Sequence, residues 1–196
     1  MEKRIEIMND QALEVIAKRR AIYPDRFNNE EITPEEVSRL LEAARFAPTH
    51  KLTEPWRFRV IMKDSKVEMT RQVKDYIENH TAKPEKGVRI AEKMDQSQAV
   101  ILIGYQRDLR ERVPEWEEMA STAMAVQNIW IYADSLGMGG YWSTGAPAVE
   151  AFNHLLELDE GEVILGMFFL GRHDFEPRPR PSTPVDGFTT DWKSVV

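Results

Sequence analysis

The chain has 196 residues, of which 42% are hydrophobic and 30% are charged, a balance typical of a globular domain with a sizeable core. Its formal net charge of −7 argues mildly against nucleic acid as the main partner. The absence of cysteine excludes a disulfide framework, a thiolate nucleophile and cysteine-based zinc or iron–sulfur sites.

The N-terminal residues are polar and lack the apolar core of a signal peptide, and no apolar run approaches the roughly 18 residues of a membrane span. We therefore expect a cytoplasmic protein with no membrane partner. His80, His154 and His173 are scattered without metal-ligand spacing, so we expect no metal site. We interpret residues 1–196 as a single domain with a C-terminal arm from about residue 172 to 196.

Helix signals begin the chain. Asn9 or Asp10 can cap a short helix that ends near Lys18-Arg19-Arg20, where cations offset the helix dipole. Thr33-Pro34-Glu35-Glu36 is a capping box with proline at the first helical position, and it predicts a helix that ends at Pro48.

A corner rich in proline and aromatic residues follows, from Ala47 to Phe58. Its two prolines push the preceding residues towards extended backbone, so we expect a fixed loop. Residues 56–62 alternate as a strand whose more buried face carries Phe58, Val60 and Met62. Ser65-Lys66-Val67-Glu68 is a second capping box for a helix to about residue 80, and a shorter charged helix follows a break at residues 83–87.

The second half of the chain is more apolar. Residues 99–105 predict a central strand buried on both faces. Residues 115–136 predict a long helix that is apolar all round, and it should be buried in the core or at a subunit interface. One stripe along it comprises Met119, Ala123, Val126, Trp130 and Ala133.

The glycine-rich stretch 137–145 after this helix can bring backbone close to a ligand. A further helix is expected over 147–158 and a last buried strand over 162–170. The tail contains Glu176-Pro177-Arg178-Pro179-Arg180-Pro181, which is extended and cannot pack as a helix.

Two segments resemble flavin-dependent nitroreductases. Ala47-Pro48-Thr49-His50 followed by Glu54-Pro55-Trp56-Arg57-Phe58 is similar to the segment that passes beside the isoalloxazine ring of FMN in that family. Arg19-Arg20-Ala21-Ile22-Tyr23 resembles the motif whose arginine and neighbouring backbone hold the FMN phosphate and ribityl chain. Ala21 stands where serine is common, and Tyr23 where a basic residue often contacts the flavin pyrimidine edge.

The resemblance implies an α+β, nitroreductase-like fold with a central mixed sheet flanked by helices, built as an intertwined homodimer with FMN at the interface. Segment 142–144 would contact the outer edge of the flavin, and Arg178 or Arg180 would bring a second charge to the phosphate. The cofactor-binding residues that it implies are Arg19, Arg20, Ala21, His50, Glu54, Trp142, Ser143, Thr144, Arg178 and Arg180.

The implied activity is the NAD(P)H-dependent reduction of nitroaromatic, quinone or related acceptors by a ping-pong mechanism, with the chemistry on FMN and no certain catalytic side chain. Glu54 departs from the family, where Gln or Asn is usual, because an ionised carboxylate only accepts hydrogen bonds. Alternatives are another flavin reaction such as reductive dehalogenation, or an FMN-binding or interaction protein of the same fold without turnover. Ala21, Tyr23 and Glu54 favour loss of the cofactor, whereas Arg19 and His50 favour retention.

Overall fold

The structure is a computed structural model that describes residues 10–178, 181, 184 and 187–189. Its α-helices are α1 (Asp10–Lys18), α2 (Pro34–Ala44), α3 (Lys63–His80), α4 (Glu85–Gln96), α5 (Glu115–Ser135) and α6 (Ala146–Leu155). Two short 3₁₀ helices are η1 (Pro24–Arg26) and η2 (His50–Leu52). The strands are β1 (Trp56–Met62), β2 (Ala99–Gln106), β3 (Met138–Ser143) and β4 (Glu162–Arg172).

The strands form one sheet in the order β1-β2-β4-β3, and all three neighbouring pairs are antiparallel. The parallel component in the described part of the chain is an isolated bridge between Ala21 and Gly140 on the edge strand β3. The predicted α+β fold is thereby confirmed. The segment that precedes η1 extends the sheet beyond its fourth strand.

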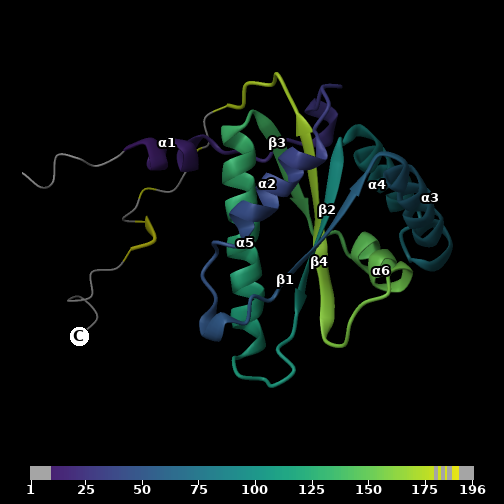
Figure 1. The fold of residues 1–196 in the computed structure, drawn as a ribbon. Helices are drawn as coiled ribbons and strands as arrows, with labels where there is room; N and C mark the ends of the chain where they lie inside the picture. The colour runs from purple at the N-terminus through teal and green to yellow at the C-terminus, as the bar shows by residue number, and fades with distance from the viewer. Residues whose placement is uncertain (1–9, 179–180, 182–183, 185–186, 190–196) are drawn as a thin grey trace, which may run out of the picture.

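Helices cover both faces of this sheet (Figure 1). On one face, α2 and α5 enclose a core that includes Leu40, Ile101 and Phe168. On the other face, α3, α4 and α6 enclose a second core that includes Val73, Phe152 and Phe169. Strand β2 lies between them with all residues but its last buried, as the continuous apolar run predicts.

The capping box at the start of α2 is confirmed. Thr33 Oγ1 accepts a hydrogen bond from the Glu36 N–H at 3.2 Å, and Glu36 Oε2 accepts one from the Thr33 N–H at 2.9 Å. These two bonds satisfy orphan donors of the first turn, so the helix begins where the sequence predicts.

The second capping box was wrong in its register. Ser65 is the third residue of α3 instead of its cap, because its hydroxyl turns back to Met62, accepting from the N–H at 3.2 Å and donating to the carbonyl at 2.6 Å. The predicted buried face of β1 was correct in part: Phe58 and Met62 pack against the core, but Val60 is 39% exposed and Ile61, on the opposite face, is 6% exposed. Helices lie on both sides of β1, so alternation alone could not identify the more buried face.

The predicted stripe on α5 coincides with the buried face of that helix only in part. Val126 and Ala133 are buried, but Met119 is 38% exposed, whereas Glu118 and Thr122 are fully buried. A helix that is apolar all round carries no periodic signal for its inner face, and Glu118 is buried because Arg107 pairs with it. No helix among the described residues is long and apolar enough to cross a membrane.

Candidate functional site

The segment Arg19–Tyr23 is fixed between α5 and the edge strand β3. The Arg19 guanidinium carbon lies 4.4 Å from the ring centroid of Trp130, whose indole N–H donates to the Arg20 carbonyl at 3.1 Å. On the other side, the Ile22 N–H donates to the Gly140 carbonyl at 3.0 Å. The backbone of the predicted phosphate motif is therefore held from both sides.

The side chain of Arg20 closes the end of α1. Its Nη1 donates to the carbonyl oxygens of Ala17, Lys18 and Arg19, at 2.5, 3.1 and 3.0 Å. These carbonyls form the negative end of the helix dipole, so the charge stabilises α1. Nearby, burial raises the pKa of Asp134 on α5, and the charges of Arg19 and His173 oppose that rise.

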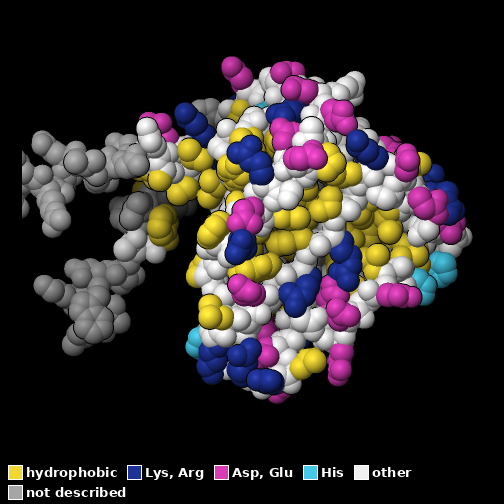
Figure 2. Space-filling model, viewed as in Figure 1, with side chains coloured by type: hydrophobic (Ala, Val, Ile, Leu, Met, Phe, Trp, Pro, Cys, Tyr) yellow, Lys and Arg dark blue, Asp and Glu magenta, His cyan; other side chains and the backbone are white. Residues whose placement is uncertain are grey.

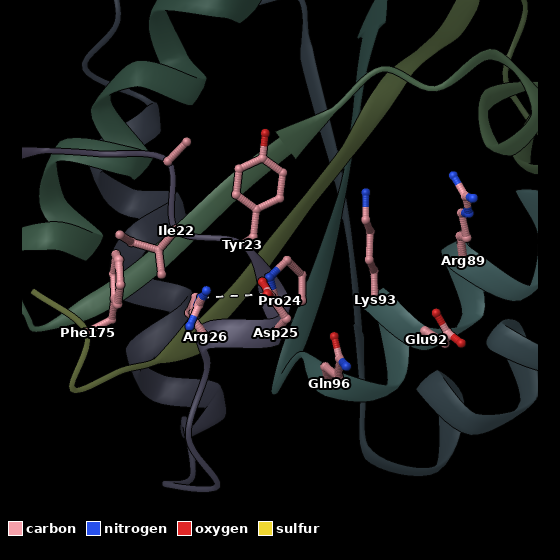
Figure 3. A pocket seen from close by; sticks show the side chains of 11 residues that line it. Ile22, Tyr23, Pro24, Asp25, Arg26, Arg89, Glu92, Lys93, Gln96 and Phe175 are labelled. Atoms are coloured by element: carbon pink, nitrogen blue, oxygen red, sulfur yellow. Dashed lines mark ion pairs between the residues drawn. The ribbon is translucent and has the colours of Figure 1, made fainter. Parts of the chain in front are cut away.

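A hollow of about 640 Å³ opens beside this segment, between η1 and α4 (Figure 3). Its volume falls in the roughly 300–1,000 Å³ range of small-molecule sites. Of the predicted site residues, Ala21 lines it. The remaining lining residues are Ile22, Tyr23, Pro24, Asp25, Arg26, Arg89, Glu92, Lys93, Gln96 and Phe175.

An aromatic wall and a cation meet at this hollow. The rings of Tyr23 and Tyr141 have centroids 4.2 Å apart, and Lys93 Nζ lies 6.0 and 5.0 Å from the two centroids. Tyr23 occupies the position where the family often has a basic residue, and Lys93 brings a positive charge to that place from α4. Sequence reasoning missed Lys93 because a charged helix does not reveal which element it faces.

A second hollow, of about 740 Å³, lies on the other side of Ile22. Its lining includes Arg20, His173 and Pro177. Arg178 follows directly in the chain and is exposed. Arg180, the alternative phosphate ligand, lies outside the described residues, as do residues 190–196 of the arm.

Three more predicted site residues, Trp142, Ser143 and Thr144, lie at the C-terminal end of β3 and directly after it. The Trp142 side chain packs against the α5 core, and its indole nitrogen is buried without a hydrogen-bond partner among the described residues. Gly166 on β4 permits this packing, since a Cβ there would lie 2.4 Å from the Ser143 carbonyl oxygen. Ser143 ends the strand and Thr144 is exposed.

The loop that carries His50 and Glu54 is strained and lies at the opposite end of α5. Lys51, Leu52 and Glu54 have φ angles of 53°, 52° and 43°, values that non-glycine residues rarely adopt. The His50 ring is held by the Glu117 carboxylate, with Nδ1 and Oε2 2.6 Å apart. The Glu54 side chain is exposed, and its N–H donates to Thr49 Oγ1 at 3.2 Å.

One chain does not bring all these residues together. Arg19 contacts α5 at Trp130 and His50 contacts it at Glu117, which a rise of about 1.5 Å per residue places about 20 Å apart. Arg19, Arg20 and Ala21 form one group with the start of β3. His50 and Glu54 form a separate group.

The model of the nitroreductase family matches residues 16–172. A curated relative, YfhC of Bacillus subtilis, is 26% identical over 183 residues, which cover 90% of this chain and 92% of the relative. Its name assigns it provisionally to the NAD(P)H nitroreductases.

Two solved structures share the fold. A nitroreductase-like family protein from Bacillus cereus superposes with a TM-score of 0.78 at 22% identity, covering 91% of this chain and 94% of its own. A nitroreductase with bound FMN from Bacteroides fragilis has a TM-score of 0.65 at 18% identity, covering 92% of this chain and 98% of its own.

Proposed function

This chain belongs to the nitroreductase family, and from that premise we propose that it is an FMN-dependent oxidoreductase. It would use NAD(P)H to reduce nitroaromatic, quinone or related acceptors by a ping-pong mechanism. The observation that carries the proposal is the hollow in which Ala21, from the predicted flavin motif, meets the Lys93 cation and the Tyr23 ring. The FMN bound to the Bacteroides fragilis structure and the NAD(P)H in the name of YfhC support it.

The residues present fit an FMN group. Arg19 and Arg20 bring positive charge towards a phosphate dianion while Arg20 Nη1 remains bound to the end of α1, and Arg178 follows the lining of the second hollow. The buried indole nitrogen of Trp142 is a donor without a partner among the described residues, which suits a carbonyl or ring-nitrogen acceptor. Lys93 supplies a cation in the first hollow, where it can face the negative charge of a reduced flavin.

FMN, when bound, accepts a hydride from NAD(P)H and passes reducing equivalents to the acceptor. The chain would contribute by positioning FMN and by placing charged groups beside it. Lys93 would stabilise negative charge that develops in the hollow, while the paired rings of Tyr23 and Tyr141 keep water from one side. Trp130 holds the Arg19–Arg20 backbone in place, so the phosphate anchor is formed in advance.

A second copy of the chain would complete the site. The outward face of α5 carries apolar side chains, with Trp116 63%, Met119 38% and Met124 40% exposed. Figure 2 shows further hydrophobic side chains gathered at α1 and in the region between α2 and β1. A two-fold axis across α5 pairs its N-terminal end with the C-terminal end of the other copy. His50 and Glu54 of one copy would then approach the Arg19 segment of the other, as in an intertwined homodimer.

Steady-state oxidation of NADH and NADPH by the purified protein, with and without added menadione, tests this function. We expect quinone-dependent oxidation and parallel double-reciprocal plots when both substrates are varied. A protein that binds FMN but oxidises neither nucleotide would instead be a flavin-binding protein of the same fold.

A further inference from the structure

We propose that Arg89 makes the hollow beside Tyr23 selective for acceptors that carry a carboxylate. This inference rests on the proposed function, since it names the class of acceptor that the same site takes.

One face of α4 forms a wall of the hollow. Arg89, Glu92, Lys93 and Gln96 all line it, and they follow one another at helical spacing. In Figure 3, the side chains of Arg89 and Lys93 rise from α4 to the same side as the Tyr23 ring, whereas the Glu92 carboxylate stays at the level of the helix. The upper part of this wall is therefore positive.

The lining cations differ in what they already contact. Arg26 pairs with Asp25 at 3.6 Å and stacks on Phe175, with 5.3 Å between its guanidinium carbon and the ring centroid. Lys93 lies over the two tyrosine rings. Within the part of the chain that the structure describes, Arg89 is exposed and makes no hydrogen bond or ion pair. Its guanidinium fork is available to a ligand.

The chemistry of this corner suits an aromatic acid. A guanidinium binds a carboxylate through two parallel N–H···O bonds, a geometry that an ammonium cannot offer. The Tyr23 ring is 48% exposed and gives an aromatic acceptor a face on which to pack. A nitrobenzoate or a carboxylated quinone could contact Arg89 and Tyr23 together, whereas its uncharged amide would lack the ionic contact.

The test compares 4-nitrobenzoate with 4-nitrobenzamide, which has nearly the same size and no charge. In Arg89→Gln, we expect kcat/KM for 4-nitrobenzoate to fall about three- to tenfold, while the value for the amide changes less than about twofold. Arg89→Lys should restore part of the loss, because it keeps the charge without the fork. Arg71→Gln on α3, outside this hollow, is the matched control and should alter neither acceptor.

A binding measurement gives a readout independent of turnover. Calorimetric titration of the oxidised protein with benzoate should give a weaker Kd in Arg89→Gln than in the wild type, by a similar factor. Equal losses with both acceptors, or an unchanged Kd for benzoate, would overturn the inference.

Two other roles for Arg89 give different results, and either would refute selectivity for the acceptor. If Arg89 held the phosphate of FMN, Arg89→Gln would weaken FMN binding and slow both acceptors alike. If it held the 2′-phosphate of NADPH, the variant would lose preference for NADPH over NADH with either acceptor. Failure of the wild type to turn over any acceptor would refute the proposed function, and the benzoate titration would still decide the role of Arg89.

Discussion

The indole N–H of Trp130 donates a hydrogen bond to the backbone carbonyl of Arg20 at 3.1 Å, while the same ring supports the Arg19 guanidinium at 4.4 Å. A residue near the end of α5 thereby positions the segment that is proposed to hold the FMN phosphate. The core helix and the cofactor site are linked through this one side chain.

Trp130→Phe should separate the hydrogen bond from the aromatic contact. Phenylalanine keeps a ring beneath Arg19 but cannot donate to Arg20, so we expect FMN affinity to fall about three- to tenfold, as for one lost hydrogen bond. Quenching of flavin fluorescence during titration measures the change. Tyr76→Phe on α3, outside both hollows, also removes one side-chain hydrogen bond and is the control, and an equal loss in both variants would contradict the positioning role.

Gly140→Ala should disturb the strand that pairs with Ala21. A Cβ at Gly140 would lie 2.2 Å from Cζ of the buried Phe168 ring, so either the ring or β3 has to shift, at a cost of about 1–3 kcal/mol. We expect a lower Tm and weaker retention of FMN. In Gly145→Ala the nearest atom to the new Cβ is Ser143 Oγ at 3.7 Å, so both properties should remain as in the wild type.

Glu162→Gln should lower stability more than a matched change at the surface. The Glu162 side chain is 1% exposed, and hydrogen bonds from Arg59 hold its pKa below the ordinary value. This stabilisation is present above the ordinary carboxylate pKa and is lost as pH falls. At neutral pH, we expect Glu162→Gln to cost about 2–3 kcal/mol, or roughly 5–10 °C in Tm.

Glu68→Gln is the control for that measurement. Glu68 pairs with Arg71 on the exposed side of α3, and the hydrogen bond from Arg71 lowers the pKa of Glu68 to about 2. Water screens such a pair, so its removal should leave the Tm nearly unchanged. Equal Tm changes in Glu162→Gln and Glu68→Gln would show that burial does not distinguish the two pairs.

Ionisation of Tyr105 should lower the stability of the protein at high pH. Burial, together with the hydrogen bond to Glu115, raises the pKa of Tyr105 to about 12. Because its pKa is raised in the folded state, the contribution of Tyr105 to stability is fully present below the ordinary tyrosine pKa near 10 and declines as the pH rises towards 12. Ultraviolet titration of the wild type should show one tyrosine that ionises only at high pH, and this step should be missing in Tyr105→Phe. Identical titration curves for the two proteins would contradict this account.

The sequence was sufficient to predict elements whose signals are local. The capping box at Thr33, the apolar run of β2 and the length of α5 were each correct because capping and complete burial leave a pattern in adjacent residues. The inner face of α5 was not predictable, because Glu118 is buried through a partner on another segment.

The candidate site was predicted in part for the same reason. Arg19, Arg20 and Ala21 adjoin in sequence and in space, so a motif identified them as a group. Lys93 and Arg89 lie far along the chain from that motif and reach the hollow because α4 packs beside η1. Only the tertiary arrangement connects them.

The flavin content of the purified protein tests the central claim most directly. After incubation with excess FMN and removal of free cofactor, we expect about one FMN per wild-type chain. We expect almost none in Ala21→Glu, which places a carboxylate in the hollow, and full occupancy in the surface control Ala82→Glu. A wild-type protein without flavin, or an Ala21→Glu variant that binds FMN as the wild type does, would contradict the assignment of this site.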